Sequence, residues 1–236
     1  MRSILMETSC PFAEVALASE GVIVCRRHLS LARQHARDLI PTLKELLVEQ
    51  GWSARSVDLL AVDVGPGSYT GLRVGVVTAK MFAYANKAKV CGIDSMTLLA
   101  MGSPVDRLSI WGIVDAQQNQ LYTQRFVRDT PGDIPRSTSP MEVMPVEEWT
   151  RRLQQGDFVT GPGLAKCSGL LDERSTLAPP GQWSPTVDAM ALELSRRSVR
   201  GEWDDPWRLA PLYLRDSSAQ IRWDSGLSKP THSPPT

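Results

Sequence analysis

The stretch that decides the fold is Val62-Asp63-Val64-Gly65-Pro66-Gly67-Ser68-Tyr69-Thr70-Gly71-Leu72-Arg73-Val74-Gly75. The apolar run 59–64 ends at two glycines around a proline, which predicts a buried strand followed by a tight turn. Ser68 or Thr70 can then cap a helix that begins near Leu72. A strand, a glycine-rich turn and a helix start direct backbone N–H groups and the positive end of a helix toward one point, which is typical of an anion site.

The glycine loop has two interpretations. It lacks the Lys-Ser/Thr of a Walker A loop, and its third glycine comes one position late for a Rossmann fingerprint. A phosphate or nucleotide site would combine loop residues with acids that end strands, and its candidates are Glu7, Gly65, Gly67, Ser68, Thr70, Arg73 and Asp115. Alternatively, the glycines serve packing, because they let the loop and the helix approach the sheet closely. Both interpretations stay open at this stage.

Composition excludes several classes of protein. The chain has 236 residues, 42% of them apolar, and its 26 Lys and Arg balance 26 Asp and Glu, so no overall charge favours nucleic acid. The four cysteines are widely spaced and the three histidines form no i, i+4 pair, which argues against a zinc site and a disulfide scaffold. No run approaches the ~20 apolar residues of a membrane helix. We expect a cytoplasmic protein with reduced thiols and no membrane contact.

The order of predicted elements indicates two α/β lobes. Strands are predicted at 4–6, 14–18, 22–29, 57–64 and 90–93, with helices at 31–50 and 72–86 and a short helix ending near 101. Beyond Ser103-Pro104, the strand 110–114 with Asp115 repeats the pattern that ends at Glu7, and 158–163 repeats 63–67. The echoes predict a duplication. We therefore expect an N-terminal lobe at 1–103, a smaller lobe at 104–215, a helix at 187–200 that packs back on the first lobe, and a disordered tail at 216–236.

A long signature connects the chain to a known family. The residues Gly65-Pro66-Gly67-Ser68-Tyr69-Thr70-Gly71-Leu72-Arg73-Val74-Gly75-Val76-Val77-Thr78-Ala79-Lys80 resemble the signature of the TsaB (YeaZ) family. Other matches in the same order are Glu7-Thr8-Ser9, residues 35–41, Cys91-Gly92-Ile93-Asp94-Ser95, Asp115-Ala116 with Leu121-Tyr122, and Pro211-Leu212-Tyr213-Leu214-Arg215. The resemblance covers 1–125 and this last motif, and is thin from 126 to 205. Glu7 stands where the family has Asp, and Gln117-Gln118 stands where it tends to carry Arg. Both departures weaken the inference that this chain binds nucleotide in the cleft as actin-like ATPases do.

The resemblance implies an actin-like (ribonuclease H-like) α/β fold with two duplicated lobes and mixed sheets flanked by helices. It implies a non-catalytic scaffold that activates the complex forming N6-threonylcarbamoyladenosine in tRNA. The partners would be a TsaD-like catalytic subunit and a TsaE-like ATPase, with tRNA reached through the complex. We expect no catalytic or metal-ligating residue and no firmly bound cofactor in this chain, and place ATP or ADP and magnesium at the level of the complex.

The resemblance also implies a partner surface on the helices at 31–50 and 72–86. The second of these helices is apolar nearly all round, and one face of a two-lobed protein can bury only part of it. The residues expected at the heterodimer interface are His35, Leu39, Leu43, Leu46, Gly75, Val77, Thr78, Met81 and Phe82. The same face is expected to form a homodimer when the partner is absent.

Three rival functions remain. The first is an autonomous actin-like, ATP-binding enzyme of the kinase type, which needs an acid at the first strand end, a second phosphate loop and an adenosine pocket. The second is a metallopeptidase-like hydrolase, which needs a metal set or a nucleophile–base pair that three histidines hardly supply. The third is an ATP-binding sensor that holds nucleotide without turnover.

Overall fold

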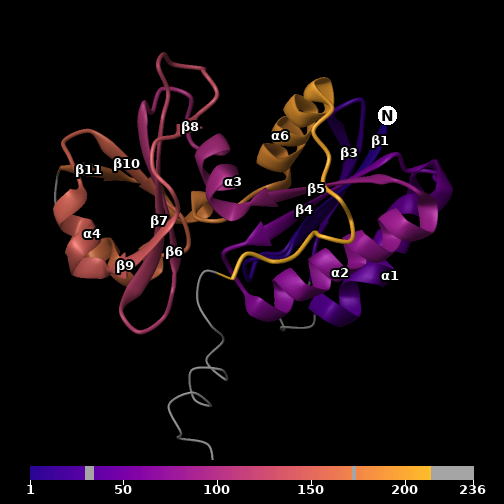
Figure 1. Ribbon diagram of the computed structural model, residues 1–236, viewed down its shortest axis with the longest axis horizontal. Coiled ribbons are helices and arrows are strands. Elements are labelled where there is room, and N and C mark those ends of the chain that lie inside the picture. Colours follow the sequence, from indigo (N-terminus) through magenta and orange to yellow (C-terminus); the bar gives the residue numbers. More distant parts are fainter. Residues whose placement is uncertain (30–34, 172–173, 214–236) are drawn as a thin grey trace, which may run out of the picture.

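Two mixed β-sheets with helices on their faces make up the computed structural model, which describes residues 1–29, 35–171 and 174–213 (Figure 1). The first sheet has the strand order β3-β2-β1-β4-β5. Its central strand β1 runs parallel to β4 and antiparallel to β2, and β4 runs parallel to β5. The strands are β1 (Arg2–Glu7), β2 (Glu14–Ser19), β3 (Val22–His28), β4 (Leu59–Gly65) and β5 (Lys89–Asp94).

The second sheet repeats this topology. Its order is β11-β10-β6-β7-β8, with β9 also paired to β7, and β6 runs parallel to β10 and antiparallel to β7. Here β6, β7, β10 and β11 correspond to β1, β2, β4 and β5. The strands are β6 (Ser109–Asp115), β7 (Gln120–Val127), β8 (Arg136–Ser137), β9 (Glu142–Pro145), β10 (Asp157–Thr160) and β11 (Ser175–Leu177). The predicted architecture, two duplicated α/β lobes with mixed sheets flanked by helices, is confirmed.

Successive side chains of each strand point to opposite faces of the first sheet, and each face has its own hydrophobic core. On one face, Ile4 and Met6 pack in a core with the helices α1 (His35–Glu49) and α2 (Tyr69–Asn86). On the other face, Leu5 and Ala16 pack against α6 (Val187–Arg200) and part of α3 (Ser95–Met101). Helices therefore cover both faces of the sheet (Figure 1).

Helix α3 belongs to both lobes. Its Leu98 and Met101 are buried with the first sheet, whereas Met96 and Leu99 are buried with the second. Gly112 of β6 lies so close to Met96 that an added Cβ would come within 3.1 Å of the Met96 sulfur. The helix therefore joins the two hydrophobic cores.

Several elements of the second lobe are short and were not expected from periodicity. They include α4 (Val146–Arg152), α5 (Leu164–Cys167), and 3-10 turns at Ser168–Leu170 and Pro180–Gln182. The first lobe contains one further described 3-10 turn, Ala54–Ser56. Buried Trp149 of α4 packs edge-on against Trp111, with ring centroids 6.3 Å apart. The short strand β8 lies in a stretch rich in Pro, Ser and Thr, residues 130–140. Helix α2 begins at Tyr69, before the expected start at Leu72, because Ser68 is the cap and accepts a hydrogen bond from Gly71 N.

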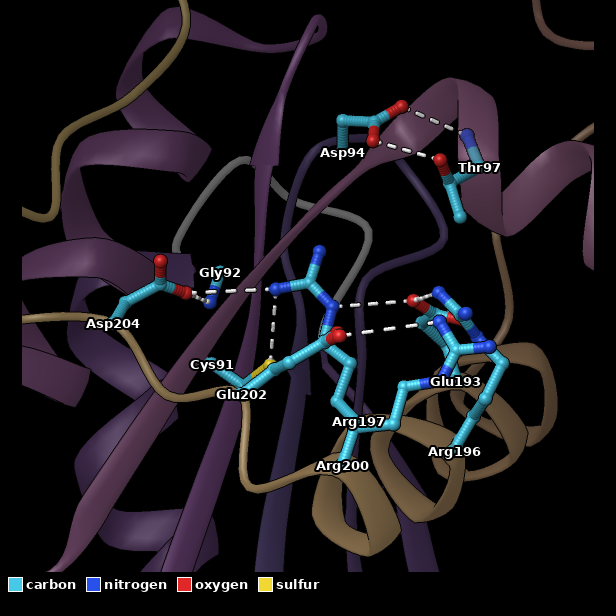
Figure 2. A network of polar contacts seen from close by, with 10 residues as sticks. All are labelled: Cys91, Gly92, Asp94, Thr97, Glu193, Arg196, Arg197, Arg200, Glu202 and Asp204. Atoms are coloured by element: carbon cyan, nitrogen blue, oxygen red, sulfur yellow. Dashed lines mark hydrogen bonds and ion pairs between the residues drawn. The ribbon is translucent and has the colours of Figure 1, made fainter. Parts of the chain in front are cut away.

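A segment after α6, which we call the C-terminal strap (residues 203–213), returns to the first sheet. Arg197 of α6 reaches toward Cys91 of β5 and Asp204 of the strap, and Glu193 binds both Arg196 and Arg197 (Figure 2). Asp204 also accepts a hydrogen bond from Gly92 N at 2.7 Å, and Leu212 N donates to Val64 O at 2.7 Å. These contacts fix the strap beside β5, β4 and α2.

Some expected features lie outside the described residues. They are the tail 216–236, the last two residues of the motif 211–215, the helix start at 31–34, and the side chain of His35. Across the described helices, none is long and apolar enough to span a membrane.

The glycine loop and the start of α2 press directly on the chain that follows β1. A Cβ added to Gly71 would lie 1.9 Å from Thr8 O, and one added to Gly67 would lie 2.4 Å from Ser9 O. A Cβ at Gly75 would meet the Thr8 hydroxyl at 2.4 Å, and Ser68 N donates a hydrogen bond to Ser9 O. The glycines therefore permit backbone-to-backbone packing that any side chain would block.

This packing makes Gly71→Ala strongly destabilising. The new methyl group would meet a backbone oxygen that cannot move independently, and we expect a loss of about 3 kcal/mol or more in the free energy of unfolding. Urea denaturation measures the loss.

Gly181→Ala is the matched control, because nothing lies within 4 Å of its added Cβ. It should change stability by no more than about 0.5 kcal/mol. A Gly71→Ala protein as stable as the control would contradict the packing role of this glycine.

Candidate functional site

Two carboxylates meet at the carboxyl end of the first sheet. Glu7 ends β1 and Asp63 lies near the end of β4, and these strands are parallel neighbours. The Glu7 and Asp63 residues are both 0% exposed. The carboxyl ends of parallel strands are where α/β proteins place ligand-binding groups, so this pair is the first candidate for a site.

Short hydrogen bonds from the chain itself surround both acids. Glu7 Oε1 accepts from Ser9 N at 2.7 Å and from the Ser9 hydroxyl at 2.5 Å, while the Cys10 thiol lies 3.1 Å from Oε2. Asp63 Oδ1 accepts from Gly65 N at 2.7 Å, and the Ser95 hydroxyl lies 2.8 and 2.9 Å from its two oxygens. The pair is therefore held in place without any external ligand.

Burial raises the pKa of both carboxyl groups. Desolvation is the largest cause in each case, and the charge of Glu7 raises the pKa of Asp63 further. Hydrogen bonds from Ser9 to Glu7 and from Gly65 to Asp63 act in the opposite direction. Two ionised carboxylates would repel each other strongly here, so the pair favours retention of one proton. Burial likewise raises the pKa of the neighbouring Cys10 thiol, which disfavours its nucleophilic form.

The other residues predicted to bind phosphate lie in different environments. Gly65 has a φ of +104° and forms the turn beside Asp63, and Gly67 faces Ser9. Ser68 caps α2, and Thr70 is exposed in its first turn. Arg73 lies on the outer face of α2, where its Nε donates to the Tyr213 hydroxyl at 3.0 Å and its guanidinium sits over the Tyr69 ring. Asp115, in the second lobe, binds Lys166 at 2.7 Å and Gln117 N at 2.7 Å.

These contacts leave little room for a phosphate between the glycine loop and β1. Ser9 O takes the hydrogen bond of Ser68 N, and Thr8 and Ser9 fill the space beside Gly67, Gly71 and Gly75. Glu7 and Asp63 have no exposed surface through which to hold a magnesium ion. The geometry therefore favours the packing interpretation, and nucleotide binding at this loop stays a prediction. Among the described residues, no group of three or more His, Cys, Asp or Glu is arranged to hold a metal.

Helix α2 exposes a continuous row of side chains on its outer face. We call the row the α2 stripe, and its members follow one another at helical spacing: Tyr69, Arg73, Val77, Met81 and Tyr84. Met81 is 68% exposed and Val77 is 53% exposed. The opposite face of α2, which includes Gly75, is buried on the sheet. Of the other expected interface residues on this helix, Thr78 and Phe82 are half-buried.

The expected interface residues of α1 lie elsewhere. Leu39, Leu43 and Leu46 are buried in the hydrophobic core of the first lobe, so they cannot contact a partner in this conformation. Helical spacing indicates that these leucines share a face but does not say what covers it. The large apolar side chains that α1 exposes within its described part are Ile40 and Val48. The surface available to a partner on α1 is therefore not the one expected from the sequence.

A pocket of about 300 Å³ lies between α2 and the C-terminal strap. Val77, Met81 and Tyr84 form its α2 side, and Pro206 and Trp207 form its strap side. Trp207 is 72% exposed, packs edge-on against Tyr84, and has its backbone oxygen bound by Lys80. An indole held at the surface in this way is unusual outside interfaces.

Sequence reasoning missed Asp63, Tyr84 and Trp207. Asp63 carried a usable signal, since a charged residue inside the apolar run 59–64 must be either paired or protonated once the strand is buried. Trp207 carried none, because its position depends on a strap that returns to α2 from the far end of the chain.

The buried acid pair makes stability depend on pH. The folded chain retains a proton that the unfolded chain, with carboxyl pKa values near about 4, releases, so the free energy of unfolding falls as the pH rises through the range between the two pKa values. Each unit of pKa difference corresponds to about 1.4 kcal/mol. Glu7→Gln removes the charge and keeps an oxygen acceptor for the two hydrogen bonds from Ser9, so it should flatten this dependence. Urea denaturation at about pH 5 and about pH 8 measures the change.

The control for that measurement is Glu147→Gln, because the Glu147 side chain is 81% exposed. It should keep the pH dependence of the unaltered protein. If Glu7→Gln also keeps that dependence, the raised pKa values are not its source.

Known proteins resemble this chain along most of its length. The TsaD family model, described as tRNA N6-adenosine threonylcarbamoyltransferase, matches residues 29–133. The tRNA threonylcarbamoyladenosine biosynthesis protein TsaB of Escherichia coli is 26% identical, covering 93% of this chain and 96% of its own length, and that of Bacillus subtilis is 26% identical, covering 94% and 98%. YeaZ from Pseudomonas aeruginosa has the same fold, with a TM-score of 0.76 at 22% identity over 90% of this chain and 99% of its own. The signature 65–80, the duplicated fold and these relatives agree: the chain is similar to the TsaB (YeaZ) family along most of its length.

Proposed function

We propose that this chain is a non-catalytic subunit of the complex that forms threonylcarbamoyladenosine in tRNA, and that it activates the complex by binding a TsaD-like catalytic subunit. Its relatives are named as tRNA threonylcarbamoyladenosine biosynthesis proteins, which supports a role of this chain in the same pathway. A scaffold role is supported by the site, since both carboxylates at the sheet end are buried and bonded to the chain's own residues. This arrangement offers no accessible acid or base to a substrate.

The observation that carries the proposal is the α2 stripe. Val77 and Met81 expose large apolar side chains beside Tyr84 and Trp207, and together they line a largely apolar pocket. A soluble protein gains from covering such a patch, and aromatic residues and methionine are enriched in the cores of interfaces. The TsaD family model matches residues 29–133, which include α1 and α2, so a TsaD-like subunit would present a related pair of helices.

The two subunits would then pair through corresponding surfaces. When related proteins use the same helix, the interface approximates a twofold arrangement, in which each α2 lies against its counterpart. The same geometry allows two copies of this chain to pair when the TsaD-like subunit is absent. A TsaE-like ATPase would join the heterodimer, which would bring ATP or ADP, magnesium and tRNA to the complex.

Reconstitution tests the proposed activity. Threonylcarbamoylation of tRNA is followed with the cognate TsaD-like subunit, TsaE-like ATPase and adenylate-forming enzyme, with and without this chain. We expect modified nucleoside only in its presence, because the stripe supplies a subunit contact that the catalytic subunit needs. Full modification without the chain would reject the activating role.

A negative charge placed on the α2 stripe should weaken partner binding while the protein stays folded. Val77→Glu or Met81→Glu would bury an unpaired carboxylate in the interface, which costs several kcal/mol. We expect binding to the TsaD-like subunit to weaken at least about 100-fold, as measured by surface plasmon resonance, and modification to be lost with it.

Val199→Glu is the matched control, because Val199 lies on α6 and is 90% exposed. It should leave binding unchanged, and circular dichroism should show all three variants folded. If both stripe variants bind as well as the control, the interface lies on another surface.

A further inference from the structure

The second lobe contains a polar hollow that the proposed function does not use. It has a volume of about 350 Å³ and lies between the sheet face of β6, β7 and β9, the helix α4, and the loop that carries Thr138 and Ser139. Its floor includes Trp111 and Met144, and its charged walls are Arg125, Glu142 and Arg152. This volume is at the small end of the range for ligand sites.

The hollow exists because the duplicated lobes differ in one helix. In the first lobe, the 15-residue helix α1 packs on β2 and buries Val15 and Leu17. In the second lobe, the 7-residue helix α4 packs on β7, the counterpart of β2, and leaves part of this face open. Thr123 and Arg125 of β7 line the opening, where a sheet face filled only for packing would carry apolar side chains.

The arginine wall is held in a fixed position. Arg125 Nε and Nη2 both donate to the Ser109 hydroxyl. Nη2 also donates to Gln154 Oε1 at 3.1 Å and to Asp157 Oδ1 at 3.2 Å. Asp157 is itself buried and accepts further bonds from Ser109 and from the Trp111 indole. Within the described part of the chain these bonds leave Arg125 Nη1 for a ligand. A guanidinium positioned by a buried carboxylate is suited to bind a carboxylate.

The opposite wall carries a carboxylate. Glu142 Oε2 accepts from Arg152 Nη1 at 2.8 Å, and Arg152 Nη2 donates to Glu148 at 2.7 Å. Glu142 Oε1 makes no hydrogen bond to the other described residues and can accept from a ligand cation. Thr123 adds an uncharged group at the floor, since its hydroxyl is buried and has no hydrogen-bond partner among the residues described.

The balance of charge selects the class of ligand. The cluster contains two guanidinium groups and the carboxylates of Glu142, Glu148 and Asp157, so it has one negative charge in excess. A bare anion such as phosphate would add to that excess, and a bare cation would offer no acceptor to Arg125 Nη1. A molecule that carries one charge of each sign satisfies both walls.

We propose that this hollow binds a small zwitterion of the amino-acid class. Its carboxylate lies on Arg125, its ammonium group lies on Glu142, and its side chain rests on Trp111 and Met144. The site is separate from the α2 stripe in residues and in chemistry, so the proposal stands or falls independently of the proposed function.

Calorimetric titration of the full chain tests the site. The probes are the common amino acids with uncharged side chains, one at a time, with acetate, methylammonium and inorganic phosphate as single-charge comparisons. We expect saturable binding of at least one amino acid with a Kd of about 1 mM or tighter, and no binding of the three comparison ions at about 10 mM. Binding of none of the amino acids at that concentration, or of acetate or phosphate as tightly as an amino acid, would overturn the proposal.

A pair of substitutions locates the binding. Glu142→Gln removes the charge that faces the ammonium group and should weaken the best amino acid at least about tenfold. Glu147→Gln on the neighbouring helix α4, where the side chain is 81% exposed, should leave the affinity unchanged. Urea denaturation confirms that both variants fold. Equal affinity for the two variants would place the bound amino acid elsewhere and reject this site.

Discussion

The structure depends on one close contact, in which the backbone after β1 lies against the glycine loop and the first turns of α2. Thr8 O and Ser9 O occupy the space that side chains at Gly71 and Gly67 would need. The contact brings Glu7 and Asp63 together at the sheet end and hides both from solvent. It also fixes α2 on the sheet, which determines that Val77 and Met81 point outward. The closed acid pair and the exposed helix row are therefore two results of the same packing.

The same contact explains how a loop with the local pattern of an anion site can serve another purpose. A helix start offers N–H groups to whatever acceptor lies nearest. Here the nearest acceptors belong to the chain itself, since Ser9 O accepts from Ser68 N and the Ser68 hydroxyl accepts from Gly71 N. Local sequence specifies the donors, whereas the strand that packs opposite decides what they bind.

The difference between local sequence and long-range packing explains which features could be predicted from the sequence. The strand–turn–helix at 59–86, the cap at Ser68 and the repeated lobe were predictable, because they depend on local periodicity and turn chemistry. The burial of Leu39, Leu43 and Leu46 was not, since spacing defines a helix face without naming what covers it. The acid pair needed the parallel register of β1 and β4, and the pocket at Trp207 needed a strap whose return no local pattern encodes. Helix α4 is too short for its periodicity to be distinctive.

Helix α3 has a mechanical consequence. Its successive residues Leu98 and Leu99 are buried in different lobes, so a rotation of one sheet against the other would pull apolar side chains out of one core or both. Two-lobed proteins that close over a ligand need a boundary that few packed residues cross. A helix shared between two cores is the opposite of a hinge. The shared helix therefore resists rotation of one lobe against the other, and we expect α2 to keep a nearly constant orientation relative to the second lobe.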